Sequence, residues 1–210
     1  EVQILQTISR KLNNSHWTIA QDSCGKAEWN KTTSRLIQSN VTCNCSFENR
    51  NVCHVTNIQL KGYNLTGVLP TELANLTHLV ELDLSRNYIN GTIPESLARL
   101  PNLRILSLLA NRLSGPIPPQ IANIDTLEEL VLEDNLLGGP LPPNLGNSKS
   151  LKRLLLSANN FTGVIPDTFG YLKNLTDFRI DGSQLSGKIP EFIGNWTSIT
   201  RLDLQGTSME

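Results

Sequence analysis

Hydrophobic and polar residues follow a pattern that repeats every 24 residues over residues 55–210. Positions 1, 4 and 6 of the repeat are apolar and the residues between them vary, which is typical of a short strand with one buried side. Positions 19 and 22 are also apolar in most copies, and they return the chain to the core. We therefore predict six full units and a truncated seventh, without insertions. The units begin at Val55, Leu79, Leu103, Leu127, Leu151, Leu175 and Ile199.

Three further positions are nearly constant. Position 9 is Asn in four units, where a buried amide can bond the backbone of the turn that leaves the strand; Tyr63 and Ser183 replace it in the first and sixth units, so we expect weaker bonding there. Position 13 is Gly, which favours a backbone conformation that other residues adopt at a cost. Position 16 is Pro, which fixes φ and marks the start of a loop or helical turn.

Position 22 departs from the apolar pattern in two units: Ser148 is polar there, and Trp196 is larger than the aliphatic residues of the other units.

No single unit can bury its apolar face alone, so the units must stack into a solenoid with a parallel sheet along one side. Each buried Leu or Ile stabilises such a stack by roughly 1.5–3 kcal/mol. The predicted fold is an α/β solenoid over residues 55–210. Residues 1–54 are expected to cap its first end, beginning with an amphipathic helix that places Val2, Leu5, Ile8 and Leu12 on one face.

The cysteines Cys24, Cys43, Cys45 and Cys53 all lie within this cap. An even number of cysteines in one short segment indicates disulfides formed in an oxidising compartment. Sequence alone does not fix the pairing; we favour Cys24–Cys43 with Cys45–Cys53, holding together an irregular stretch. A zinc site made by Cys43, Cys45, Cys53 and His54 is the alternative, disfavoured because zinc ligands are usually spaced more widely than Cys-x-Cys.

Composition narrows the function classes. The chain has 18 basic and 19 acidic residues and no basic run, which argues against nucleic-acid binding. No stretch approaches the about 20 consecutive apolar residues of a membrane span. The sequence begins at Glu1 with neither an initiator Met nor the apolar core of a signal peptide. It ends at Glu210, which is position 12 of a unit, just before the expected Gly of position 13. We therefore expect a processed or truncated chain whose natural protein continues.

Ten Asn-x-Ser/Thr sequons indicate passage through the secretory pathway; the alternative is that several of them arise only from the repeat consensus. Within the repeats they begin at positions 10, 12, 21 and 24, and never at the positions expected to face outward from the concave side of the sheet. We therefore expect a concave face that is free of N-glycans. The sequons begin at Asn13, Asn30, Asn40, Asn44, Asn64, Asn75, Asn90, Asn160, Asn174 and Asn195.

The unit with Leu-x-Gly-x-Ile-Pro, as at residues 113–118, resembles the plant-specific class of leucine-rich repeats, and the resemblance covers about three quarters of the chain. The cap is similar to the N-terminal region of plant receptor-like kinases that carry leucine-rich repeats followed by a malectin-like domain. One departure is Ser23, where that family commonly has Pro. The residues that carry the similarity are Trp17, Trp29 and the segments 22–24, 41–46, 53–55, 83–87 and 193–197.

This resemblance implies a right-handed plant-type leucine-rich-repeat superhelix with a parallel concave β-sheet and a disulfide-stapled N-terminal cap. It also implies a single-pass plasma-membrane receptor, with this chain on the extracellular face and a serine/threonine kinase inside the cell. The chain itself has none of the kinase motifs, so kinase activity would belong to the rest of the parent protein. Any recognition of a cell-wall oligosaccharide would belong to the malectin-like region.

The candidate binding surface is the outward-facing side of the sheet, at positions 3, 5, 7 and 8 of the units. We expect an exposed apolar island there, and such islands often mark contact surfaces. A peptide, a protein ectodomain or a co-receptor would suit this long, mixed surface. The island comprises Ile105, Leu109, Val131 and Leu155, and its charged rim comprises Glu129, Glu133, Asp134, Arg153, Asp177, Arg179 and Asp181.

Three alternatives remain. First, the charges Glu129, Arg153, Asp177 and Arg201 could serve only as a ladder of ion pairs between strands about 4.8 Å apart. Second, the chain could be a secreted inhibitor of cell-wall polygalacturonases. Plant inhibitors of that kind have similar repeats, but they differ from this chain in having another type of cap and a closed C-terminal end.

Third, an enzyme is disfavoured, because a glycosidase pair needs a cleft that an open solenoid lacks. The acids considered for such a pair are Glu128, Glu129, Glu133 and Asp134, and the histidines His16, His54 and His78 have no paired nucleophile. We expect no catalytic residue, metal or cofactor in this chain.

Overall fold

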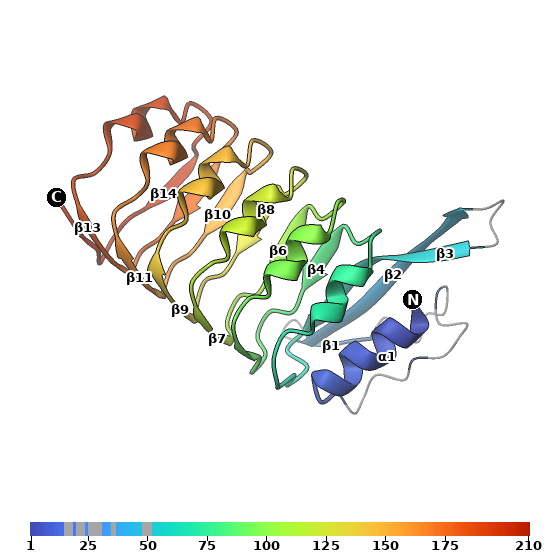
Figure 1. The fold of residues 1–210 in the computed structure, drawn as a ribbon. Helices are drawn as coiled ribbons and strands as arrows, with labels where there is room; N and C mark the ends of the chain where they lie inside the picture. The colour runs from blue at the N-terminus through green and yellow to red at the C-terminus, as the bar shows by residue number, and fades with distance from the viewer. Residues whose placement is uncertain (15–18, 20–23, 25–30, 35–36, 48–51) are drawn as a thin grey trace.

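The computed structural model describes residues 1–14, 19, 24, 31–34, 37–47 and 52–210, with the backbone alone for 31–34 and 37–40. Its turns lie side by side in one long stack, and the α-helix of residues Val2–Lys11 lies at the N-terminal end (Figure 1). The sequon residue Asn30 and the cap residues His16, Trp17, Ser23 and Trp29 lie outside the described residues.

The main sheet has nine strands, and from β3 onward the strand of each turn pairs in parallel with the strand of the next turn. The register is offset by one 24-residue unit at every step, as in the pairs Glu81 with Ile105 and Ile105 with Glu129. The predicted solenoid of stacked 24-residue units is therefore confirmed. The repeat strands are β3 (Val52–Lys61), β4 (Glu81–Asp83), β6 (Ile105–Ser107), β8 (Glu129–Val131), β10 (Arg153–Leu155), β12 (Asp177–Arg179) and β14 (Arg201–Asp203).

A second parallel sheet of six strands, which we did not predict, runs along another side of the stack. Position 13 lies in or beside these strands, and its six glycines have φ between +75° and +86°. The predicted need for Gly is therefore confirmed, because this region of φ is costly for other residues. The strands are β5 (Asn90–Gly91), β7 (Arg112–Gly115), β9 (Leu136–Pro140), β11 (Asn160–Gly163), β13 (Gln184–Gly187) and β15 (Ser208–Met209).

Six short 3₁₀ helices complete the turns, and the proline at position 16 is the N-cap residue of each of them, as predicted from its fixed φ. In Figure 1 they line the side of the stack away from the second sheet. Their bounds are η3 (Thr71–Asn75), η4 (Glu95–Arg99), η5 (Pro119–Asn123), η6 (Pro143–Asn147), η7 (Asp167–Tyr171) and η8 (Glu191–Asn195).

Aliphatic side chains at positions 1, 4 and 6 fill a continuous interior, and most of them are fully buried. The two departures at position 22 are accommodated differently. Trp196 is 2% exposed, and its Nε1–H donates to the carbonyl of Phe169 at 3.0 Å. Ser148 is equally buried, but its Oγ has no hydrogen-bond partner among the described residues.

The cap begins with α1 (Val2–Lys11), in which Leu5 and Ile8 are buried and Val2 is half-buried, so the predicted amphipathic helix is confirmed. The prediction that the stretch after this helix is irregular is wrong for its residues 31–34 and 37–47, because β1 (Lys31–Ser34) and β2 (Ile37–Phe47) extend the main sheet, and β2 pairs antiparallel with β3; residues 15–18, 20–23, 25–30, 35–36 and 48–51 lie outside the described residues. The physical reason is that the first repeat strand leaves an open edge whose N–H and C=O groups need partners. The expected boundary between residues 54 and 55 falls inside β3.

Both expected disulfides form: Cys45–Cys53 joins β2 to β3, and Cys24–Cys43 ties Cys24 to β2. The zinc alternative is excluded, because a cysteine in a disulfide has no thiolate to offer a metal. Among the residues that the structure describes, we find no helix with the length and apolar character to cross a bilayer.

Candidate functional site

The outer face of the main sheet, which corresponds to the predicted concave face, presents positions 3, 5 and 7 of each unit. In β4 and β6 the central residue is buried and the residues on either side are half-buried. This alternation follows from the period of two of a β-strand. Each outward position therefore forms a column of side chains that crosses the strands at right angles.

The expected apolar island on this face is only partly correct. Ile105 and Leu109 are half-buried and reach the surface, whereas Val131 is 8% exposed and Leu155 is 2% exposed. Val131 pairs in register with Leu155, which in turn pairs with Arg179. Side chains on neighbouring strands of one face lie close enough to cover each other. The apolar surface therefore reduces to Ile105 and Leu109 at one end of the predicted patch.

The charged residues of the rim are joined by ion pairs across three strands. Arg153 contacts Glu129 on β8 at 2.6 Å and Asp177 on β12 at 3.8 Å. Arg179 contacts Asp177 at 2.5 Å and Glu133 at 3.8 Å. The charge ladder considered as an alternative therefore forms at Glu129, Arg153 and Asp177. Asp177, the residue that both arginines contact, is only 8% exposed.

The carboxyl group of Glu133 lies in an unfavourable environment. Burial raises its pKa, Arg179 partly offsets the effect, and Asp134 and Asp181 add to it through repulsion. The pKa of Arg179 is raised in turn, chiefly because it donates a hydrogen bond to Asp177. Since the folded protein holds the Glu133 proton more tightly than the unfolded chain does, this group lowers stability as pH rises through the interval above its ordinary pKa. A cation bound beside Glu133 would relieve that cost.

Glu128, considered above for a catalytic pair, lies outside this group of acids. Its carboxylate accepts hydrogen bonds from Lys152 and Arg104, which lower its pKa. These residues occupy position 2 of three successive units and form a separate surface ladder.

The sequon asparagines whose side chains the structure describes, which are those other than Asn30 and Asn40, are all exposed. In the repeats, Asn90 lies on β5 and Asn160 on β11, both in the second sheet, while Asn75 and Asn195 end the short helices η3 and η8. None of the repeat strands β3 to β14 contains a sequon asparagine. The cap strand β2 differs, because it includes Asn40 and Asn44. The sequon-free part of the main sheet therefore begins at β3.

A second apolar surface lies along the edge of the second sheet, and sequence reasoning missed it. Val68, Leu136 and Val164 are each more than half exposed. A groove of about 730 Å³ opens between units here, lined by Pro116, Pro140, Val164 and further prolines. The missed signal is position 14, which is apolar in four of six full units beside the constant proline.

Comparison with known proteins agrees with this architecture. Leucine-rich-repeat family models match residues 53–113, 126–148 and 150–172. A probable LRR receptor-like serine/threonine-protein kinase of Arabidopsis thaliana is 58% identical over 75 residues, which are 34% of this chain and 7% of the relative's length. The chain thus spans a small fraction of that relative.

Solved structures extend the similarity over the whole fold. The PEPR1–AtPEP1 structure is 30% identical, with a TM-score of 0.81, and the match covers 99% of this chain and 28% of that one. A chain of the BIR3–SERK2 complex from Arabidopsis thaliana is also 30% identical, with a TM-score of 0.67, over 80% of this chain and 87% of that one. The chain therefore belongs to the leucine-rich-repeat family, in the form found in the ectodomains of plant receptor-like kinases.

Proposed function

We propose that this chain is the extracellular recognition segment of a plant receptor-like kinase, and that it binds a peptide or another ectodomain on the outer face of the main sheet. The observation that carries the proposal is that the repeat strands contain no sequon asparagine, while Asn90 and Asn160 lie in the second sheet and Asn75 and Asn195 end short helices. Glycans would cover those sides and leave the repeat strands accessible. The similar structures support a protein partner, since one is the PEPR1–AtPEP1 structure and another is the complex of BIR3 with SERK2.

The partner's chemistry follows from the residues on this face. Ile105 and Leu109 supply an apolar contact on β6 and the turn after it. Next to Leu109, burial of the Glu133 carboxyl raises its pKa, Arg179 partly offsets this, and the negative charges of Asp134 and Asp181 add to it. A partner that places an apolar side chain beside a Lys or Arg would satisfy both features. The binding residues that we propose are Ile105, Leu109, Glu129, Glu133, Asp134, Arg153, Asp177, Arg179 and Asp181, with Val131 and Leu155 beneath them.

Receptor context extends the proposal beyond this chain. The similarity to receptor kinases supports a plasma-membrane parent with a cytoplasmic serine/threonine kinase domain. The cap motifs support a malectin-like region in that parent, which would bind any cell-wall oligosaccharide. Sequencing of the full-length transcript tests both parts. An inhibitor of cell-wall hydrolases is less well supported. The curated relative is a probable receptor-like kinase, and neither the PEPR1–AtPEP1 structure nor the BIR3–SERK2 complex is described as a hydrolase inhibitor.

The binding surface can be tested by replacing the two exposed apolar residues. We expect the double variant Ile105→Arg/Leu109→Arg to lose at least about tenfold in affinity for its partner, because it removes the apolar contact that reaches the surface of this face. The measurement is a binding screen of the glycosylated chain against secreted peptides and receptor ectodomains. Both residues are half-buried, so the fold can accept the longer side chains.

The matched control is Val164→Arg, which places the same charge on an apolar residue, 58% exposed, beside the second sheet. This variant should bind normally. If Val164→Arg abolishes binding while the double variant at Ile105 and Leu109 binds as before, the outer face of the main sheet is not the binding site.

A further inference from the structure

Two histidines stack where the cap meets the first repeat. His54 and His78 are 24 residues apart and precede the first residue of successive units, so the repeat itself brings their rings together. The ring centroids are 3.8 Å apart and the rings are inclined by 17°. Phe47 of β2 packs edge-on against both rings, at 4.8 Å and 4.9 Å. Both imidazoles are half-buried, so solvent still reaches them.

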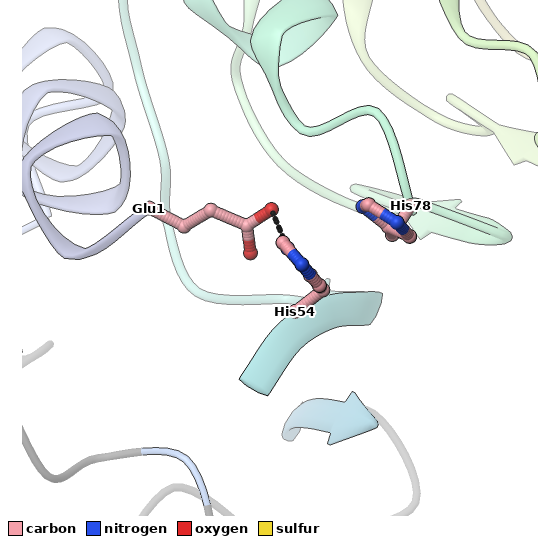
Figure 2. Close-up of side chains that lie close together, drawn as sticks. All are labelled: Glu1, His54 and His78. Carbon is pink, nitrogen blue, oxygen red and sulfur yellow. Dashed lines mark hydrogen bonds and ion pairs between the residues drawn. The ribbon is translucent and has the colours of Figure 1, made fainter. Parts of the chain in front are cut away.

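A carboxylate from the start of α1 completes the cluster (Figure 2). Oε2 of Glu1 accepts a hydrogen bond from the backbone N–H of Val55 at 2.6 Å, and Oε1 lies 3.0 Å from Nδ1 of His54. Because the backbone holds one oxygen, the other is oriented toward the histidine ring. The side chain of Glu1 is 16% exposed and that of His54 is 26% exposed.

Later units use this position for a different purpose. Asn102, Thr126 and Asn174 occupy it, and each donates a hydrogen bond to a carbonyl of the preceding turn, at 2.9 Å, 2.7 Å and 2.8 Å. His78 instead contacts the hydroxyl of its own neighbour, Thr77, at 3.4 Å. The bond between turns that serves the later repeats therefore does not account for a pair of histidines here.

We propose that Glu1, His54 and His78 form a binding site for a divalent transition metal, with Zn²⁺ as the ion that suits the ligands best. One ligand atom from each of the three residues lies within 4.8 Å of the others. Two imidazole nitrogens and one carboxylate oxygen are a known zinc ligand set, and three protein ligands leave a fourth position for water or a partner's side chain.

Metal binding requires a local rearrangement of side chains. The lone pair of an imidazole nitrogen lies in the ring plane, so two nearly parallel rings cannot direct their lone pairs at one ion. Rotation of His78 about its side-chain torsions would bring its nitrogen toward an ion about 2.0–2.2 Å from each ligand. The bound ion would join the start of α1 to the first two turns of the solenoid. Its effect on stability gives a second readout besides affinity.

The test is titration of the chain with Zn²⁺ alone by isothermal calorimetry. The chain is purified without a histidine tag, with its disulfides intact and with a short Gly-Ser extension so that no α-amine adjoins Glu1. We expect saturable one-to-one binding at pH 7.5 and a melting temperature that rises with Zn²⁺ concentration. Binding should weaken at pH 5.5, because protons compete with the metal for the imidazole nitrogens. No saturable binding at pH 7.5 would overturn the proposal.

Variants locate the site. His78→Asn introduces the residue that Asn102 already provides at the same position, and Glu1→Gln keeps an oxygen for the N–H of Val55. Both should lose at least about tenfold in Zn²⁺ affinity, since each lacks one ligand. Glu95→Gln, an exposed acid of η4, is the control and should bind as the parent chain does.

Unchanged Zn²⁺ affinity in His78→Asn would show that the ion binds elsewhere. If that variant does not melt cooperatively without metal, Glu1→Gln decides the question in the same way. The partner-binding experiment above does not depend on this outcome, because Ile105 and Leu109 belong to the third unit and are not among the three proposed ligands.

Discussion

At the scale of single residues, position 8 carries a strain that recurs in every unit. Its φ is positive throughout, from +53° at Ala158 to +71° at Gly62, although Arg86, Ala110 and Asp134 are not glycines. The geometry is maintained because the N–H at this position donates to the next turn, as from Ala110 to the carbonyl of Glu133 at 2.9 Å. Hydrogen bonds between turns thus offset the steric cost of the left-handed conformation.

Replacing Ala110 with Gly should therefore raise the free energy of unfolding by about 0.5–1 kcal/mol. Gly adopts this φ without the steric cost, and that gain exceeds the extra entropy it loses on folding. Chemical denaturation followed by circular dichroism measures the difference. Ala122→Gly is the control, because Ala122 is buried in η5 and its replacement should be destabilising. Destabilisation by Ala110→Gly would show that the strain is absent.

At the scale of the element, the asparagines at position 9 join each turn to its neighbours. The side-chain amide of Asn135 donates to the carbonyls of Leu108, Leu132 and Glu133, and its Oδ1 accepts the N–H of Leu113. Asn87, Asn111 and Asn159 make the same four bonds in their own units. Ser183 donates one bond, to the carbonyl of Ile180, which agrees with the weaker bonding expected there.

We expect Asn135→Ala to lower the free energy of unfolding by roughly 2–4 kcal/mol, because the buried N–H of Leu113 and the carbonyls lose their partner. Ser183→Ala should cost only about 1 kcal/mol, since a single bond is lost. Equilibrium unfolding of both variants gives the comparison. Equal costs at the two positions would contradict a ladder that is stronger at Asn135.

At the scale of the whole molecule, stability comes from turns that cover each other. Leu130 lies in the middle of the stack and is 1% exposed, whereas Leu202, at the same position of the last unit, is 40% exposed. A middle turn has neighbours on both sides, and in the described structure the last turn is covered on one side only. The same sequence position therefore contributes a different free energy at different places in the stack.

Leu130→Ala should lower the free energy of unfolding by about 2–5 kcal/mol, as expected for a cavity in a closed interior. Leu202→Ala should cost less than about 1.5 kcal/mol, because this side chain already contacts solvent. Thermal and chemical unfolding of the two variants tests the difference. A cost at Leu202 that matches the cost at Leu130 would mean that the last turn is covered in solution.

Much of the fold follows directly from the sequence, because its signals are local and repeated. The 24-residue period predicts the stack and the register of its strands, and Gly at position 13 and Pro at position 16 predict the backbone at those positions. The clustered cysteines led to the favoured pairing. Such features depend on residues at a fixed distance along the sequence, so they can be predicted without a structure.

The remaining features required the tertiary structure, because they depend on contacts that no single unit defines. Val131 and Leu155 match an outward-facing pattern, yet their neighbours on adjacent strands bury them. Glu1 is 53 residues from His54, and only the folded structure brings the two together, with the Glu1 carboxylate bonded to the N–H of Val55 in β3. The sequence by itself determined that the units stack; the stacked geometry decided which outward-facing side chains reach solvent and which distant residues meet.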